Sequence, residues 1–238
     1  MLQSFEKPEL SASPGMSTIQ EEFDRIALVS PEGATHNDHY HNFLLRHLPA
    51  NCQNALDIGC GTGSFARRLA ERSQHVLALD LSAEMIRIAR ERSENVPNID
   101  FRLANVMDIN FDLGSFDCIA TIATLHHLPF EKVLLDMKRA LKPGGVMLIL
   151  DLFEAAGLAD SLSNFIALPI STVLRLKHHG RLFPDREERA AWNAHAKRDS
   201  YPTIEKVHAI CERILPGAKI RKHLLWRYSV VWQKAVDE

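Results

Sequence analysis

The stretch ALDIGCGTG, residues 55–63, decides the fold class. It begins as a short apolar run, typical of a buried strand, and ends with a glycine at every second position: Gly59, Gly61 and Gly63. A ligand at the carboxyl end of a strand touches the backbone, and only glycine leaves room for that approach. A helix is predicted from Ser64, and its first N–H groups would be free to face the same ligand. The loop therefore predicts a place where the backbone meets a small polar molecule.

A second acidic residue strengthens this prediction. Asp80 ends the next predicted strand, in LALDLS (residues 77–82), 17 residues after Gly63. A carboxylate at this position can accept hydrogen bonds from both hydroxyls of a ribose. The alternative is a helix cap, but Ser82 is the better N-cap for the helix that follows. We therefore expect Asp80 to bind a ribose.

The surrounding pattern indicates an α/β fold, because strand-like and helix-like segments alternate from about residue 55 to 150. Apolar runs predict strands at 54–59, 75–82, 99–105, 116–123 and 145–153, and helical spacing predicts helices at 64–73, 83–93 and 130–141. Such alternation is typical of a parallel sheet covered on both faces. After an irregular helical region, a helix at 203–215 precedes two strand-like runs in 218–235, which predict a hairpin at the sheet edge.

Composition fits one large domain of an ordinary soluble protein, with 238 residues, 46% hydrophobic and 24% charged. The four cysteines are scattered and form no CxxC, which favours a reducing compartment: Cys52, Cys60, Cys118 and Cys211. The first residues lack a secretory signal, and no apolar run is long enough to span a membrane. We therefore expect a cytoplasmic protein.

The net charge of −2 hides an asymmetry along the chain. Residues 175–227 hold 13 Lys or Arg against 6 Asp or Glu, whereas the rest of the chain is acidic. Solvated helix faces explain this pattern. The alternative is a surface for an anionic substrate, a membrane lipid or RNA.

Four motifs together carry a resemblance to a known family: ALDIGCGTG, LALDLS, FDCIATIATLHHL (116–128) and LKPGGVMLILD (141–151). In this order they resemble the class I S-adenosylmethionine-dependent methyltransferases over roughly residues 50–153. The resemblance implies a Rossmann-like, doubly wound, seven-stranded and mostly parallel sheet with an antiparallel C-terminal hairpin. A GxGxG loop in place of GxGxxG disfavours the alternative of a nicotinamide dehydrogenase.

The same resemblance implies a division of the chain. Residues 1–50 would form an N-terminal arm and helices covering the cofactor, and residues 51–153 the S-adenosylmethionine-binding core. Residues 154–201 would insert a helical cap over the substrate, and residues 202–238 would complete the sheet.

The family's cofactor roles pass to the matching residues. The loop against the methionine part of S-adenosylmethionine would comprise Asp57, Gly59, Cys60, Gly61 and Gly63. Asp80 would hold the ribose and Leu81 would pack on the adenine.

Beyond the second strand, the match is less complete. Asn105 stands where the family usually has aspartate, and its carbonyl oxygen can still accept from the adenine amino group. Val106 would offer its backbone N–H to the ring, and Ile122 would touch the methionine end.

Histidines are the candidate bases. His126 and His127 follow the fourth strand, near the expected methyl group, so His126 is a catalytic candidate and His127 a substrate contact. The alternative is a structural pair. Upstream, His36 and Tyr40 fall at helical spacing, and could face the site as a second candidate base and a cofactor contact. The alternative there is an ordinary amphipathic helix. A metal is not expected in the histidine-rich segment 36–41, because no cysteine or carboxylate set accompanies it at a known spacing.

The predicted cap supplies the remaining substrate candidates, Phe165, Leu168 and Trp192. Alternatives for this segment are simple core packing, or an interfacial helix with a basic end at 177–181 that touches a membrane surface. We expect in-line methyl transfer to a small, largely apolar organic acceptor, and no nucleic-acid partner. The alternatives are an RNA or protein methyltransferase that uses the basic C-terminal region, or a non-catalytic S-adenosylmethionine-binding protein. The sequence leaves the oligomeric state open.

Overall fold

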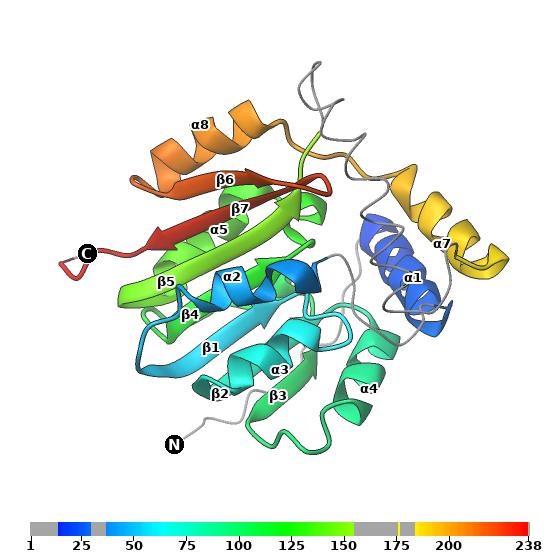
Figure 1. Ribbon diagram of the computed structural model, residues 1–238, viewed down its shortest axis with the longest axis horizontal. Helices are drawn as coiled ribbons and strands as arrows, with labels where there is room; N and C mark the ends of the chain where they lie inside the picture. Colours follow the sequence, from blue (N-terminus) through cyan, green and yellow to red (C-terminus); the bar gives the residue numbers. More distant parts are fainter. Residues whose placement is uncertain (1–13, 30–36, 155–175, 177–183, 238) are drawn as a thin grey trace.

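The computed structural model describes residues 14–29, 37–154, 176 and 184–237. Within them, seven strands form one sheet in the order β3-β2-β1-β4-β5-β7-β6 (Figure 1). The strands are β1 (Cys52–Ile58), β2 (Ser73–Asp80), β3 (Ile99–Leu103), β4 (Phe116–Ile122), β5 (Leu141–Leu152), β6 (Lys219–His223) and β7 (Arg227–Gln233). β1 to β5 are parallel, and β7 is antiparallel to both of its neighbours. The predicted sheet and its C-terminal hairpin are confirmed.

Two element boundaries differ from the prediction by three residues or more. The helix expected at 64–73 ends at Ala70, because Ser73 already pairs with Cys52 in the sheet. The fifth strand begins at Leu141 rather than 145, because Leu141 pairs with Phe116 ahead of a register shift between Phe116 and Cys118.

Two apolar cores lie on opposite faces of the sheet, since successive strand residues point to opposite sides. On one face, Leu56 and Ile58 of β1 pack with α5 (Phe130–Ala140) and α8 (Ile204–Ile214). On the other, Ala55 packs with α2 (His41–Leu45), α3 (Ser64–Ala70) and α4 (Ala83–Glu91). The short 3₁₀ helices are η1 (Asp38–Tyr40), η2 (Val106–Asp108) and η3 (Leu125–His127).

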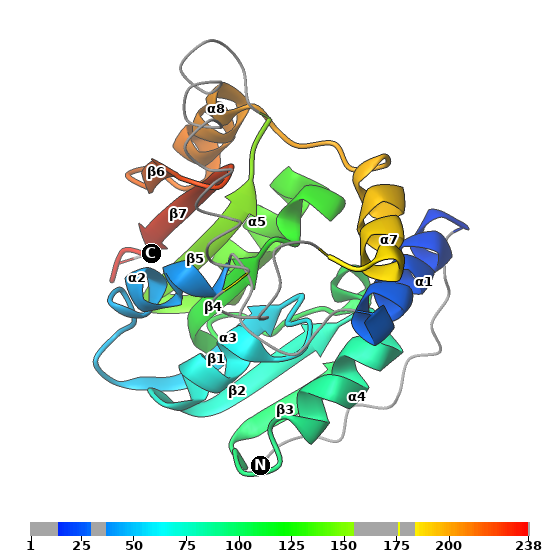
Figure 2. The same ribbon diagram turned by 45° about the vertical axis from the view of Figure 1, so that its right-hand side comes forward.

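A third, smaller cluster attaches two further helices to the fold. α1 (Pro14–Val29) and α7 (Arg186–Ala196) lie side by side, on the side toward which the parallel strands point (Figures 1 and 2). Ile26 of α1, Met85 and Ile88 of α4, and Ala191 of α7 are buried together. This pair of helices therefore covers the carboxyl ends of the parallel strands, where the glycine loop lies. Among the helices in the described part of the chain, none has both the length and the apolarity needed to cross a bilayer.

Candidate active site

A cavity of about 270 Å³ lies at the carboxyl ends of β1, β2 and β4. Most of the predicted site residues line it: Asp57, Gly59, Cys60, Gly61, Asp80, Leu81, Asn105, Val106, Ile122, His127 and Trp192. Gly63, Tyr40 and His126 are not among the lining residues. His36, Phe165 and Leu168 lie outside the described residues.

Helix α1 forms one wall of this cavity, and none of its residues was among the site residues predicted from the sequence. Ile19, Phe23 and Ile26 line it from α1, opposite the loops that carry the glycines. The attachment is polar as well as apolar, because Asp24 of α1 accepts from the Ser82 hydroxyl at 2.5 Å and from the Glu84 N–H at 3.1 Å. Only an amphipathic pattern marks α1 in the sequence, and that pattern does not say which surface the helix covers.

The three glycines of the loop have different reasons for lacking a side chain. All have positive φ: +71° at Gly59, +52° at Gly61 and +77° at Gly63. A Cβ on Gly59 would lie 2.1 Å from Thr124 Oγ1, and one on Gly63 would lie 2.9 Å from the Phe101 ring. On Gly61 the nearest atom would be 4.0 Å away. Gly61 alone of the three leaves its space open toward the cavity, and the other two serve close packing.

Asp80 organises this loop. Its two carboxylate oxygens accept the N–H of Gly61 at 2.8 Å and the N–H of Ser82 at 2.9 Å. Burial raises the pKa of Asp80, and these backbone donors oppose that effect. Ser82 caps α4 by accepting from the Met85 N–H, as predicted, so Asp80 is free of the capping role.

Asp57 carries a buried carboxyl group with one oxygen that lacks a hydrogen-bond donor among the described residues. Its side chain is at the end of β1, the residue is only 1% exposed, and Oδ2 has no hydrogen-bond partner among the described residues. Burial first, and the charge of Asp80 second, raise the pKa of Asp57 to about 7. A buried acceptor without a donor is unfavourable by about 1–3 kcal/mol. A ligand donor in the cavity, above all a cationic one, would satisfy it.

Asn105 is committed locally. Its Oδ1 accepts from the Met107 N–H at 3.0 Å, and its amide donates to Asp108. The side chain thus caps η2, and one lone pair of the carbonyl oxygen remains for a ligand.

The two neighbouring histidines have separate environments. His126 Nδ1 lies 2.6 Å from Asp151 Oδ1, its backbone N–H donates to Asp151 Oδ2, and its side chain is 3% exposed. His127 lines the cavity instead. Burial and the neighbouring His126 ring lower the pKa of His127 to about 4. The pair therefore presents one ring to the cavity and one ring to a buried carboxylate.

Tyr40 is held away from the cavity. Its hydroxyl donates to the Leu224 carbonyl oxygen at 2.6 Å, in the turn between β6 and β7. Its neighbours Asp38 and His41 line the cavity in its place, so the predicted segment reaches the site through other side chains.

Comparison with known proteins adds to this geometry. Residues 56–149 match the family model described as a methyltransferase domain. An uncharacterized methyltransferase of Mycobacterium tuberculosis is 29% identical over 207 residues, covering 84% of this chain and 96% of that protein. A ubiquinone biosynthesis O-methyltransferase of Xanthomonas oryzae pv. oryzae is 33% identical over 146 residues, covering 60% of this chain and 61% of that protein.

A solved structure agrees in fold. Geranyl diphosphate C-methyltransferase from Streptomyces coelicolor A3(2) superposes with a TM-score of 0.65 at 12% identity, covering 95% of this chain and all of that one. The glycine loop, the sheet order and these matches define an enzyme of the methyl-transferring class. Residues 56–149 match a methyltransferase domain, and together these findings support a class I S-adenosylmethionine-dependent methyltransferase.

Proposed function

We propose that this enzyme transfers the methyl group of S-adenosylmethionine to a small, largely apolar organic acceptor. One observation carries the proposal: the buried carboxyl of Asp57, the half-buried carboxyl of Asp80 and the open backbone of Gly61 line the same cavity as an apolar wall. The polar half matches an amino-acid and ribose-bearing cofactor. The apolar half is formed by Phe23, Leu128 and Trp192, and we propose that the acceptor lies against these side chains.

Different residues would bind different parts of the cofactor. Asp80 would accept from the ribose hydroxyls, and Asp57 would face the cationic methionine end, where its unpartnered oxygen finds a donor. Leu81 and Val106 would bracket the adenine. When bound, S-adenosylmethionine supplies an electrophilic methyl group on a sulfonium. The protein then has to align the acceptor and exclude water, and alignment alone can supply about 7–11 kcal/mol of barrier reduction.

The relative named as a ubiquinone biosynthesis O-methyltransferase supports a small acceptor over a macromolecular one. For a direct contact between the histidine pair and the acceptor, the geometry favours His127, because it lines the cavity. His126 would act by positioning, through its bonds to Asp151.

We expect Trp192→Ala to raise KM for the acceptor while leaving S-adenosylhomocysteine affinity within about twofold. Trp192 is 45% exposed and lines the cavity from α7, so its truncation removes acceptor contact rather than a core residue. The size of the effect should be about 1–3 kcal/mol, as for other apolar pocket groups. Labelled methyl transfer from S-adenosylmethionine to a panel of quinols, catechols, aryl amines and fatty acids would identify the acceptor and give KM.

The matched control is Leu135→Ala, which truncates a similarly exposed apolar residue on α5 that does not line the cavity. It should leave KM unchanged. Label entering RNA or protein substrates but no small molecule would contradict the proposed acceptor class.

The raised pKa of Asp57 predicts that cofactor affinity depends on pH. Because its pKa in the free protein is about 7, binding of the cationic cofactor must release a proton at lower pH. We expect S-adenosylmethionine affinity to rise by up to about tenfold per pH unit as the carboxyl ionises, then to level off above about pH 8. Calorimetric titrations across this range would measure the slope.

Asp57→Asn should weaken binding and flatten that dependence. The stability of the cofactor-free protein should depend on the ionisation of Asp57 in the opposite direction. A carboxyl whose pKa is raised on folding favours the folded state at low pH, and this contribution is lost as pH rises toward 7. The cofactor-free Asp57→Asn variant should thus melt higher than the parent at alkaline pH. Asp112→Asn, at an exposed loop position, should change neither property. An unchanged pH slope in Asp57→Asn would contradict the assignment.

A further inference from the structure

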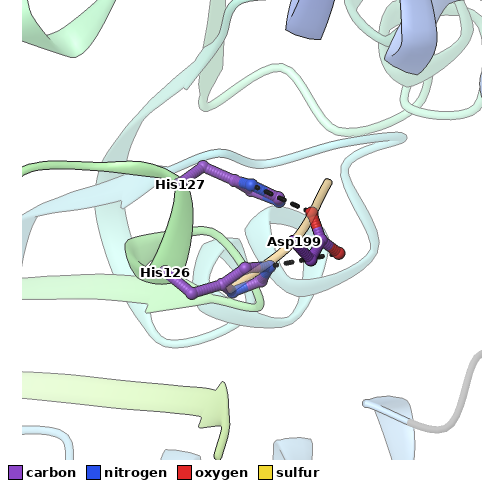
Figure 3. A group of neighbouring side chains, drawn as sticks. All are labelled: His126, His127 and Asp199. Carbon is purple, nitrogen blue, oxygen red and sulfur yellow. Dashed lines mark ion pairs between the residues drawn. The ribbon is translucent and has the colours of Figure 1, made fainter. Parts of the chain in front are cut away.

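Four buried titratable side chains from distant segments meet beside the cavity. His126 and His127 come from η3, while His195 and Asp199 come from α7 and the turn after it. We call these four residues the histidine–aspartate cluster. None of their side chains is more than 11% exposed. Figure 3 shows His126 and His127 both turned toward the Asp199 carboxylate.

Distances within this cluster do not match a hydrogen-bond network. His127 Nδ1 lies 3.6 Å from Asp199 Oδ1, and His126 Nε2 lies 4.0 Å from Asp199 Oδ2. Both separations are too long for hydrogen bonds. Ligand atoms about 2.0–2.2 Å from a tetrahedral metal ion are about 3.3–3.6 Å apart. One ligand atom from each of His126, His127 and Asp199 lies within 4.8 Å of the others, so a small contraction gives a coordination sphere.

Further carboxylates orient two of the three histidines, whereas Nε2 of His127 has no hydrogen-bond partner among the described residues. His126 Nδ1 is bound by Asp151 at 2.6 Å, and His195 Nδ1 lies 3.2 Å from Glu22 of α1. In both rings this leaves Nε2 facing Asp199, at 4.0 Å from His126 and 3.4 Å from His195. Metal-binding histidines almost always place their second ring nitrogen on a carboxylate or carbonyl, which fixes the tautomer of the ligating nitrogen.

The acidic ligand is oriented too. The Tyr201 hydroxyl donates to Asp199 Oδ2 at 2.7 Å. Asp199 Oδ1 faces His127, whereas Oδ2 is the oxygen near His126 and His195.

We propose that His126, His127 and Asp199 bind a divalent transition-metal ion of the zinc type, with His195 adjoining as a fourth donor. Imidazole and carboxylate together suit Zn²⁺ and its neighbours, whereas Mg²⁺ and Ca²⁺ prefer sites made of oxygen ligands. From the sequence, a metal was considered only for the histidines of segment 36–41 and was not expected there. The cluster became visible only when the fold joined η3 to the turn after α7.

The ion would have two consequences. It would join the segment after α7 to η3, because its ligands come from both. It would also border the acceptor half of the cavity, since His127 lines that cavity, and could bind an acceptor oxygen. The second consequence rests on the proposed function, whereas metal binding itself does not.

Titration of Co²⁺ into the untagged full-length chain, without cofactor, tests the site. We expect visible ligand-field absorption that saturates at one equivalent and disappears when Zn²⁺ displaces Co²⁺. Zinc calorimetry should likewise give one site, and Mg²⁺ in excess should not compete. Bound Zn²⁺ should raise the melting temperature, because it stabilises only the folded chain.

Two variants test the ligands. His127→Ala and Asp199→Asn should each lower Zn²⁺ affinity by more than about 100-fold, and Asp151→Asn by about 10–100-fold, as for an outer partner of a metal-bound histidine. The control is His208→Ala, an exposed histidine on α8, which should change nothing. Asp199→Asn keeps an acceptor for Tyr201, and S-adenosylhomocysteine binding by each variant reports on its fold.

Absence of a one-equivalent site in the parent chain would overturn the metal proposal, as would unchanged affinity in both ligand variants. Either result would leave the methyl-transfer proposal intact if S-adenosylhomocysteine still bound. Metal binding without S-adenosylhomocysteine binding would reject the proposed function and keep the metal site.

Discussion

Replacing Asp80 by alanine is expected to weaken S-adenosylhomocysteine binding by about 10²–10⁴-fold. A hydrogen bond to a charged group is worth about 1.5–3 kcal/mol, so losing both ribose hydroxyls removes about 3–6 kcal/mol. Each 1.4 kcal/mol corresponds to about tenfold in affinity. Asp80 also accepts the N–H of Gly61, so the variant loosens the loop as well. Isothermal titration calorimetry on the intact chain, with NADH as a second ligand, measures the change.

Two controls separate ribose binding from loop support. Asp100→Ala removes a carboxylate from neighbouring β3 whose side chain is 55% exposed, and should leave the affinity unchanged. Asp80→Asn keeps an acceptor oxygen for Gly61 and should give an intermediate loss. Unaltered affinity in Asp80→Ala, or tighter binding of NADH than of S-adenosylhomocysteine, would refute the cofactor assignment.

Gly59→Ala is expected to lower the free energy of unfolding by about 2–5 kcal/mol. The left-handed backbone at φ +71° costs a non-glycine residue about 1–2 kcal/mol, and the added Cβ would lie 2.1 Å from Thr124 Oγ1. Inserting a methyl group into such a packed place costs about 1–3 kcal/mol more. For a chain of this size each kcal/mol shifts the melting temperature by about 2–4 °C, so calorimetry should show a drop of about 4–20 °C.

Gly217→Ala is the matched control, because its φ is +79° but nothing lies within 4 Å of the added Cβ. It should show the backbone effect alone, about 1–2 kcal/mol. Adding Thr124→Gly to Gly59→Ala should recover the packing part and leave the backbone part, so the two changes would not be additive. Equal losses of unfolding free energy in Gly59→Ala and Gly217→Ala would show that Thr124 moves aside at no energetic cost.

The sequence could predict features that depend on neighbours a few residues away. The apolar run that ends at Ile58, the positions of Asp57 and Asp80 at strand ends, and the Ser82 cap all follow from local pattern, and the structure places them as expected. The alternation of strands and helices also predicted the parallel sheet, because parallel strands need a long crossover connection, which is usually a helix. The order of four motifs pointed to the family.

Contacts between distant segments decided the rest. Gly59 and Gly63 looked like room for a ligand, but the side chains that fill their space come from elsewhere: Thr124 follows β4 and Phe101 lies within β3. In the same way, only the packing of η3 determined that His127 lines the cavity and His126 does not.

The largest part that only the tertiary structure decided is the layer of α1 and α7. Phe23 and Trp192 complete the apolar wall, and Asp199 meets the histidines of η3, although these segments are far apart in the chain. The spacing of apolar residues in the sequence shows which face of a helix is buried. It does not show which surface of the protein that face packs against. That choice depends on the summed packing of Ile26, Met85 and Ala191, which is fixed only when the whole chain has folded.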